Sequence, residues 1–300
     1  MRFSYLACLA AAIFVAHAQT RPPIVGVGYI ALRTDDMNAA RAFYSGVLGY
    51  DAAFESRAET KGGPVRTHFK VNDHQYIDIV PELAGPDQDR LIEIAFETTN
   101  AEQLRKYMAA KGVKTPAKAG RDADGNTSFA IDDPDGHRVV FIQYLPGSLH
   151  GRNFGKHISD RRVSERMIHV GVIVKDRAAA DALYRDVLGF KLQWYGGMKD
   201  DRTDWVSMRV PEGTDWIEYM LNVNNPSPKT RGVMHHLALG VPSVAEGYKT
   251  VTGRGLNPEK PKVGRDGKWQ LNLYDPNLTR SELMEPKPVE TPCCSPIVTE

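Results

Sequence analysis

Two histidines and two glutamates in the second half of the chain are the residues best suited to hold a metal ion. They are His169, Glu218, His236 and Glu282, and each falls in a short apolar run typical of a β-strand. Two imidazoles and two carboxylates are the ligand mix of a divalent transition-metal site. With no cysteine in the set, it suits Ni²⁺, Zn²⁺, Co²⁺, Mn²⁺ or Fe²⁺ equally. The sequence therefore predicts one divalent metal per chain.

An internal repeat makes these four positions informative. The two halves align in three segments: FYSGVLGY (43–50) with LYRDVLGF (183–190), QYIDIV (75–80) with DWIEYM (215–220), and DDPDGHRVVF (132–141) with YDPNLTRSEL (274–283). In this alignment the four candidate ligands fall opposite Tyr29, Asp78, Ile92 and Val140 of the first copy. Because both copies build one scaffold, positions where they differ carry information about function. The first copy is predicted to bind no metal and to act as a packing partner.

The predicted strands orient these side chains. Side chains alternate along a strand, so His169 should point the same way as Gly171 and Ile173, toward the interior. A buried imidazole or carboxylate is costly without a partner, and a dication supplies one for all four groups. His235 precedes His236 directly, so it should face away from the site and hydrogen-bond elsewhere.

The same order of elements, β-α-β-β-β, is predicted four times, which indicates an α+β fold. In the third unit Asp176 caps a helix that Gly189 ends, and in the fourth Ser243 and Glu246 form a capping-box signature. The four units are expected at about 24–80, 90–146, 167–222 and 232–287. Residues 147–165 are polar and contain glycine, and are predicted to be a linker.

In these features the chain resembles the vicinal oxygen chelate (VOC) superfamily, which includes glyoxalase I, methylmalonyl-CoA epimerase, extradiol dioxygenases and bleomycin-resistance proteins. The resemblance covers nearly all of 24–287 and rests on the helix endings FYSGVLGY and LYRDVLGF and on the DPDG and DPN turns. It implies that paired βαβββ modules curl into cupped mixed sheets. An N-terminal domain without metal ligands would span 24–146, and a C-terminal domain with the metal site 166–287. In that domain His169 and Glu218 would be the ligands from unit three, and His236 and Glu282 those from unit four.

The resemblance also implies a glyoxalase-like isomerase, lyase or epimerase, in which Glu218 or Glu282 takes a proton from a small oxygen-chelating substrate. The first alternative is an Fe(II) extradiol-type dioxygenase that uses His169, His236 and Glu282. Against it, the stretch GRDGKWQLNLYDP has no histidine and carries Asn272 where that family has a tyrosine. Glu218 would also fill a position needed for oxygen. The second alternative is a non-enzymatic small-molecule binding protein. No motif names the substrate.

The two ends of the chain carry further predictions. Residues 1–18 have the pattern of a cleaved signal peptide, with Arg2, an apolar run and Ala16-His17-Ala18 before the cut, so a periplasmic or secreted protein is expected. Without Arg2 the basic and acidic residues balance at 37 each, which points to no nucleic-acid or membrane partner. A homodimer is left open. Residues 288–300 are expected to be an exposed tail, in which a disulfide between the adjacent Cys293 and Cys294 is disfavoured.

Overall fold

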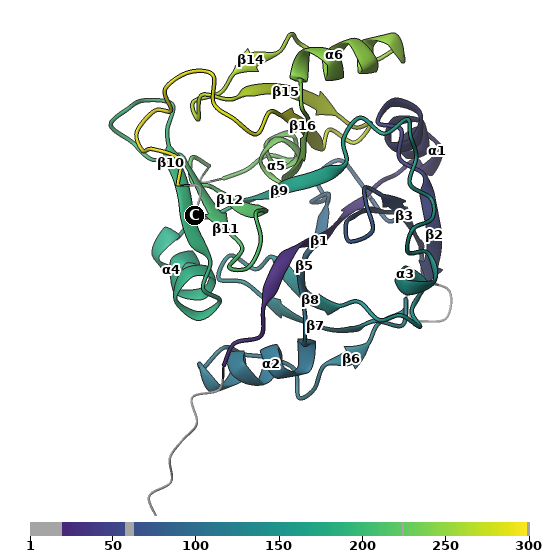
Figure 1. Ribbon diagram of the computed structural model, residues 1–300, viewed down its shortest axis with the longest axis vertical. Helices are drawn as coiled ribbons and strands as arrows, with labels where there is room; N and C mark the ends of the chain where they lie inside the picture. The colour runs from purple at the N-terminus through teal and green to yellow at the C-terminus, as the bar shows by residue number, and fades with distance from the viewer. Residues whose placement is uncertain (1–19, 58–62, 224, 299–300) are drawn as a thin grey trace, which may run out of the picture.

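The computed structural model describes residues 20–57, 63–223 and 225–298, so the predicted signal peptide lies outside the described residues. Each half of the chain builds one eight-stranded mixed sheet with few helices, curled into a half-barrel (Figure 1). The strand orders are β2-β3-β4-β1-β5-β8-β7-β6 and β10-β11-β12-β9-β13-β16-β15-β14, which are the same order twice. The predicted α+β fold of four βαβββ modules in two tandem domains is confirmed.

The first half contains the following elements in chain order: β1 (Ile24–Arg33), α1 (Met37–Arg41), η1 (Ala42–Val47), β2 (Ala52–Arg57), β3 (Val65–Lys70), β4 (Tyr76–Val80), β5 (Leu91–Thr98), α2 (Ala101–Ala110), β6 (Gly120–Arg121), β7 (Thr127–Asp132), β8 (Arg138–Gln143) and α3 (Leu149–Arg152). The last of these lies within the predicted linker, 147–165, which is therefore partly helical.

The second half repeats the order with α5 added and without a counterpart of α3: β9 (Arg166–Ile173), α4 (Arg177–Asp181), η2 (Ala182–Val187), β10 (Lys191–Gly196), β11 (Trp205–Arg209), β12 (Trp216–Met220), α5 (Pro228–Met234), β13 (His236–Gly240), α6 (Val244–Gly253), β14 (Lys262–Val263), β15 (Trp269–Tyr274) and β16 (Arg280–Met284). The sequence did not predict α5, a short helix that leads directly into β13.

The helix of the third unit begins and ends where the sequence predicts. Asp176 accepts hydrogen bonds from the backbone N–H groups of Ala178 and Ala179, and Gly189 has a φ of 77°, a left-handed conformation that favours glycine. Between these ends the α-helix α4 widens into the π-helix η2, as α1 does into η1. In the fourth unit Ser243 caps α6 through the N–H of Glu246, whose side chain pairs with Lys249 rather than returning to the cap.

The two halves meet around an approximate two-fold axis. Gln75 and Asp215 occupy equivalent positions in the two copies, and Nε2 of Gln75 donates to Oδ2 of Asp215 over 3.1 Å. Tyr44 donates its hydroxyl proton to Asp275 in the second half, over 2.9 Å, and its counterpart Tyr184 donates to Asp133 in the first, over 3.1 Å. The halves therefore hold each other through reciprocal buried hydrogen bonds.

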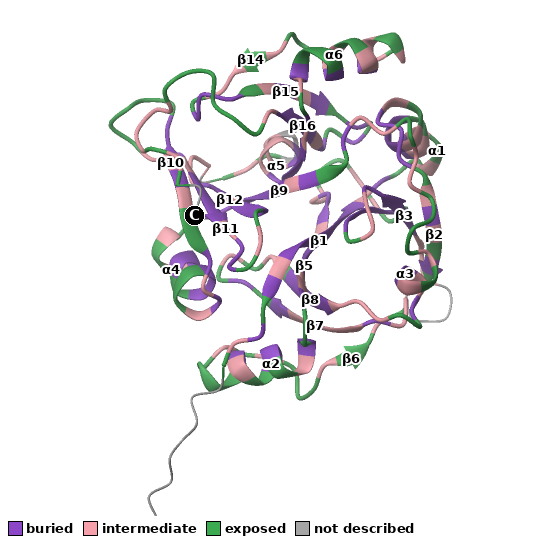
Figure 2. Ribbon diagram, viewed as in Figure 1, coloured by how far each residue is buried: buried purple, intermediate pink, exposed green. Residues whose placement is uncertain are grey.

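The hydrophobic core runs through both halves as one cluster of buried side chains. Phe96 of the first half packs edge-on against Phe190 of the second, with ring centroids 5.1 Å apart. In Figure 2 the buried residues follow the central strands of both sheets, whereas the helices are exposed along their outer faces. The central strands are therefore the rigid part of the molecule, which suits them to carry a site.

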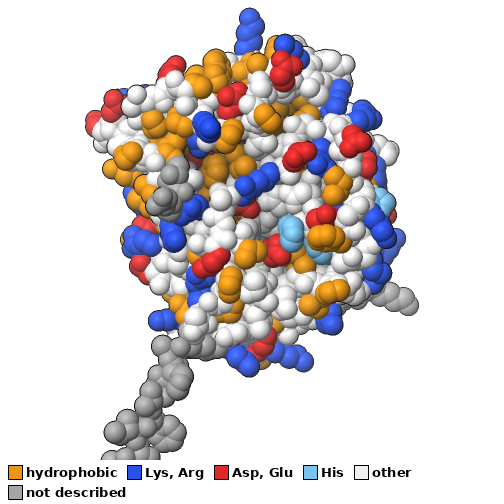
Figure 3. Space-filling model, viewed as in Figure 1, with side chains coloured by type: hydrophobic (Ala, Val, Ile, Leu, Met, Phe, Trp, Pro, Cys, Tyr) orange, Lys and Arg blue, Asp and Glu red, His pale blue; other side chains and the backbone are white. Residues whose placement is uncertain are grey.

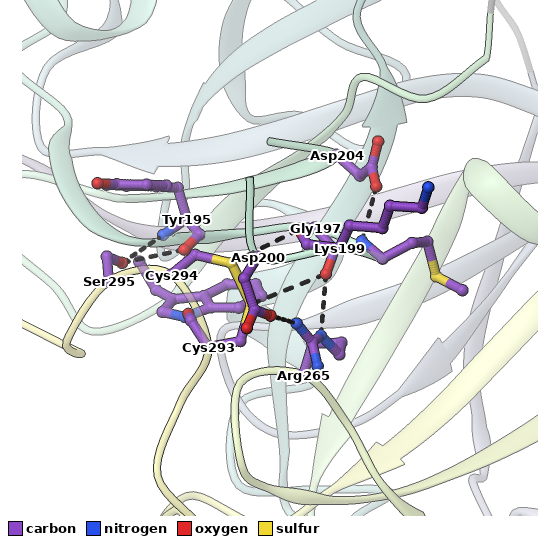
Figure 4. Close-up of a disulfide and its surroundings, with 11 residues drawn as sticks. Tyr195, Gly197, Lys199, Asp200, Asp204, Arg265, Cys293, Cys294 and Ser295 are labelled. Atoms are coloured by element: carbon purple, nitrogen blue, oxygen red, sulfur yellow. Dashed lines mark hydrogen bonds and ion pairs between the residues drawn. A yellow bond between two sulfur atoms is a disulfide. The ribbon is translucent and has the colours of Figure 1, made fainter. Parts of the chain in front are cut away.

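The C-terminal tail corrects two expectations. It packs against the second half: the backbone N–H of Cys293 donates to the carbonyl of Arg265, and that of Val298 to Gln193 of β10, both over 2.8 Å. Cys293 and Cys294 form a disulfide, which the sequence disfavoured. Cys294 has a φ of 70°, and the anchored backbone on either side holds this left-handed turn, which places both sulfurs beside Gly197 and Lys199 (Figure 4).

The surface shows charges of both signs. Acidic and basic side chains are interspersed over the visible face (Figure 3), in keeping with their near-equal numbers in the chain. Within the described residues, no helix has the length and apolar character needed to cross a membrane.

Candidate metal centre

The candidate ligands come from four neighbouring strands at the middle of the second sheet, β12, β9, β13 and β16. The strand register arranges them in two neighbouring rows that run across the strands, two residues apart. Gly171 pairs with both Glu218 and His236, and Ala238 pairs with both His169 and Glu282. A small residue therefore stands at the centre of each row. A Cβ atom on Gly171 would lie 2.0 Å from the ring of His236, so only glycine leaves that imidazole its place.

The four side chains converge on one point. Nε2 of His169 lies 3.0 Å from Nε2 of His236 and 3.8 Å from Oε2 of Glu282. Oε2 of Glu218 lies 3.4 Å from Nε2 of His236 and 4.0 Å from Nε2 of His169. His169, His236 and Glu282 form a compact buried triad whose ligand atoms all lie within 4.8 Å of one another. Oε2 of Glu218 is as close to the two imidazole nitrogens as Oε2 of Glu282, which lies 3.8 Å from His169 and 4.0 Å from His236.

Both imidazoles are neutral at ordinary pH. Burial lowers the pKa of His169 well below its usual value, and burial followed by the charge of Arg280 does the same for His236. Nδ1 of His236 donates to the carbonyl of Met234 over 2.8 Å, which leaves its Nε2 as the lone-pair nitrogen. A backbone carbonyl on the outer nitrogen is the usual support of a metal-binding histidine, since it fixes both ring orientation and tautomer.

The carboxylate of the triad lacks full charge compensation from the protein. Burial raises the pKa of Glu282 to about 7, although Arg280 opposes this shift. Nδ1 of His169 is likewise buried without a hydrogen-bond partner. Two neutral imidazole nitrogens and a buried carboxylate at one point form a donor set that a divalent cation fits and whose charge it would neutralise. The residues present therefore fit the predicted metal; whether all four act as ligands stays a prediction.

A small cavity of about 280 Å³ opens onto the two carboxylates. Glu218, Glu282 and Arg280 line it together with Trp194 and Trp205, whereas the two histidines lie behind its wall. Of the other tryptophans, Trp216 packs against the ring of His169 at 4.8 Å, and Trp269 is partly exposed outside the lining. A ligand in this cavity would meet the carboxylates and the tryptophans first.

Arg280 is a site residue that the sequence analysis missed. Its Nη2 lies 2.8 Å from Nε2 of His236, so this guanidinium competes with a metal for the same lone pair. Arg280 precedes Glu282 by two residues on β16, and strand alternation alone would have placed both on one face. His235 was placed correctly: its Nδ1 lies 3.1 Å from Asp89, away from the site.

The first copy differs from its prediction at one of four positions. Ala95 pairs with Tyr29 as Ala238 pairs with His169, so the counterpart of His236 is Glu93 and not Ile92. Tyr29, Asp78 and Val140 hold the counterpart positions as predicted. The error arose because the alternating strand LIEIAFET can be aligned with MHHLALGV one residue out of step, and the pairing across the sheet decides the register.

An arginine stands at the centre of the first cup. Arg66 contacts Glu93 at 2.9 Å and Asp78 at 3.5 Å, and Tyr29 donates its hydroxyl proton to Glu93 over 2.9 Å. Burial alone would raise the pKa of Glu93, but Arg66 and then Tyr29 lower it, so this carboxylate stays charged. In the strand register, Arg66 of the first copy occupies the position equivalent to Trp205 of the second copy. The guanidinium of Arg66 therefore contacts both Asp78 and Glu93, the counterparts of Glu218 and His236.

Comparison with known proteins agrees with the internal repeat. Residues 26–141 and 166–277 both match one family model, described as the Glyoxalase/Bleomycin resistance protein/Dioxygenase superfamily.

Several solved structures share the fold. The Mn(II)-bound glyoxalase from Novosphingobium aromaticivorans is 18% identical, over 91% of this chain and 86% of that one, with a TM-score of 0.67. A complex of homoprotocatechuate 2,3-dioxygenase from Brevibacterium fuscum with 3,4-dihydroxyphenylacetate is 19% identical, over 89% and 82%, with a TM-score of 0.61. The 2,3-dioxygenase LapB from Pseudomonas sp. KL28 is 17% identical, over 91% and 97%, with a TM-score of 0.64. At these identities the likeness concerns the fold.

Proposed function

Because the chain belongs to the Glyoxalase/Bleomycin resistance protein/Dioxygenase superfamily, we propose that it is a metal-dependent enzyme with glyoxalase-like isomerase, lyase or epimerase chemistry. Its substrate is a small molecule with two neighbouring oxygen atoms. The position of Glu218 carries this proposal. This carboxylate lies 3.4 Å from His236, and 12% of its side chain is exposed against 4% for Glu282, so it is the carboxylate better able to leave the ligand set and accept a proton.

The residues divide the work as follows. His169, His236 and Glu282 would hold a divalent ion, with Glu218 as a fourth, exchangeable ligand. Such an ion stabilises the negative charge that develops on the substrate oxygens when a proton leaves the neighbouring carbon. Glu218, which borders the cavity, accepts that proton and returns it to the adjacent carbon in an isomerisation. Glu282 takes this role if Glu218 stays a ligand.

The surroundings of the carboxylates suit a small anionic transition state. Arg280 offers a guanidinium at the edge of the triad, 2.8 Å from His236, where it can bind a substrate oxygen. Trp194 and Trp205 line the cavity of about 280 Å³ and keep water away from the exchanging proton. A cavity of this size admits only a small molecule.

Proton exchange with solvent tests the proposal without knowledge of the natural substrate. Protein loaded separately with nickel, zinc, cobalt, manganese or iron is incubated under nitrogen in deuterated buffer with small hydroxy ketones and 2-hydroxy acids, and deuterium incorporation at the oxygen-bearing carbons is followed by NMR. At least one metal should support exchange. Glu218→Gln should remove most of it, because glutamine keeps the shape but accepts no proton near neutral pH. His235→Ala is the matched control and should retain it. Absence of exchange with every metal and substrate would count against the proposal.

A dioxygenase is the second candidate, and the compact triad favours it. Two histidines and one carboxylate are the ligand set of non-haem iron oxygenases, and Glu218 lies outside that set. Asn272, which pairs with Glu282 across β15 and β16, argues against it, since it stands where the resemblance leads one to expect a tyrosine. An oxygen electrode separates the candidates. Iron-dependent oxygen uptake with a catechol, retained in Glu218→Gln, would establish the dioxygenase and refute the first proposal.

A further inference from the structure

A serine, a histidine and an aspartate in the first cup form a chain of contacts that the metal chemistry does not use. Ser56 lies on β2, His68 on β3 and Asp78 on β4. Oγ of Ser56 lies 2.8 Å from Nε2 of His68, and Nδ1 of the same ring lies 2.8 Å from Oδ1 of Asp78. Hydroxyl, imidazole and carboxylate in this order activate a serine for attack on a carbonyl carbon.

The sheet fixes the three groups relative to one another. His68 pairs with Asp78 across β3 and β4, and Ser56 pairs with Arg66, two residues before His68, so all three side chains share one face. The ring of Phe54 stacks on the imidazole at 4.3 Å. Oδ1 of Asp78 is buried and makes no hydrogen bond in this geometry, although Nδ1 of His68 lies 2.8 Å from it; Oδ2 of Asp124 lies 3.6 Å from Nε2 of the same ring.

The serine faces a cavity and the other two groups lie behind it. Ser56 lines a cavity of about 720 Å³ in the first cup, together with Arg66 and Arg121. His68 and Asp78 are buried and do not reach its wall. A substrate would therefore meet the hydroxyl first, the base second and the carboxylate last. Arg66 is paired with Glu93 and Asp78, so Arg121 is the guanidinium placed to donate to negative charge on a carbonyl oxygen; the carboxylates of Asp122 and Asp124 line the same cavity.

The second copy lacks this arrangement. In the strand register, the positions equivalent to Ser56, His68 and Asp78 are held in the second copy by Gly196, Ser207 and Glu218. The shared scaffold therefore does not require the three residues of the first cup, since the other cup folds without two of them. His68 and Ser56 belong to one copy alone, in the cup where Arg66 contacts Asp78 and Glu93.

We propose that the first cup is a second active site, with Ser56 as nucleophile, His68 as general base and Asp78 as the group that orients His68. Its substrate class is small polar esters of carboxylic acids. Oγ of Ser56 attacks the carbonyl carbon while Nε2 of His68 takes the hydroxyl proton. The bond to the leaving alcohol breaks as His68 gives that proton to the alcohol oxygen. Water then attacks the acyl-serine, His68 takes a proton from it and returns it to Ser56, and the carboxylic acid leaves.

A serine-directed probe tests the proposal on the intact protein. Wild-type protein is treated with diisopropyl fluorophosphate and measured by intact-mass and peptide mass spectrometry. In parallel, hydrolysis of p-nitrophenyl acetate is followed by absorbance at about 400 nm. We expect one phosphoryl adduct per chain, located on Ser56. Ser56→Ala should lose both adduct and hydrolysis, and His68→Gln should slow both by about 100-fold or more. Ser128→Ala is the control: this serine lines the same cavity without a histidine partner, and its loss should change neither readout.

Metal removal keeps the two sites distinguishable. Chelation with EDTA should leave the adduct on Ser56 unchanged, because none of the three residues belongs to the second cup. The proposal is overturned if wild-type protein forms no adduct, if the adduct lies on another residue, or if Ser56→Ala hydrolyses the ester as fast as the wild type. None of these results depends on a variant that must fold, except the last, for which circular dichroism of Ser56→Ala against Ser128→Ala verifies the fold.

Discussion

Two adjacent histidines give the sharpest test of the metal centre, because strand geometry sends one into the site and the other away. Nε2 of His236 lies within 3.4 Å of both His169 and Glu218, whereas Nδ1 of His235 lies 3.1 Å from Asp89. Both rings are buried, so His236→Ala and His235→Ala should each cost stability of similar size, about 1–3 kcal/mol. Only His236→Ala should also weaken metal binding.

The metal-dependent shift in Tm isolates that difference. At a free metal concentration of about 100 times Kd, binding stabilises the wild type by about 2.7 kcal/mol. At about 2 °C per kcal/mol for a chain of this size, Tm should rise by about 5 °C. If loss of the His236 ligand raises Kd about 100-fold, the same metal concentration adds only about 0.4 kcal/mol, or about 1 °C. His235→Ala should keep the full shift above its own lower baseline.

The measurement is thermal unfolding by circular dichroism after exhaustive dialysis against chelator, with and without each of the five metals. Elemental analysis of the reloaded protein should find close to one equivalent per chain. Glu93→Gln in the first cup serves as the control for location and should leave the shift unchanged. The reasoning is refuted if His235→Ala removes the shift while His236→Ala keeps it, or if no metal shifts the wild type.

Three further predictions concern other groups. Arg280→Gln should bind metal at least as tightly as the wild type, because Arg280 competes for Nε2 of His236. The KM of this variant for an oxyanionic substrate should rise about tenfold or more. Weaker metal binding in a titration would contradict this prediction. In metal-free protein the lowered pKa of His236 contributes stability that is present above about pH 6.5, the value in the unfolded chain, and is lost as pH falls. Urea unfolding between pH 6.5 and 5 should therefore show the wild type losing about 1 kcal/mol per pH unit more than His236→Gln, and equal slopes would contradict this. We also propose that residues 1–18 are cleaved on export, so N-terminal sequencing should begin at Gln19, and retention of Met1 in exported protein would disprove it.

Most of the fold could be predicted because local sequence signals mark the helices and strands of each module. Asp176 and Gly189 mark the ends of one helix, and the recurrence of the same signals in both halves fixes the four modules. The convergence of His169, His236 and Glu282 was expected from the family resemblance, and strand alternation added that His169 points inward. What was missed depends on pairing between strands. Glu93 rather than Ile92 faces Ala31, and only the register across the sheet shows this.

The remaining errors have a tertiary origin as well. The disulfide between Cys293 and Cys294 exists because the tail is anchored to Arg265 and Gln193, contacts about 30 and 100 residues away in sequence that no local pattern announces. The role of Arg66 was equally hidden, since a lone arginine in a strand ordinarily points to solvent. Its role as a counter-charge follows only from the structure, in which Arg66 contacts both Asp78 and Glu93.

That arginine has a consequence for how the molecule is assembled in the cell. A cation that is part of the polypeptide is present from the moment of synthesis, so the first cup can balance Asp78 and Glu93 before any metal is encountered. The first half therefore needs no metal supply to neutralise its two central carboxylates.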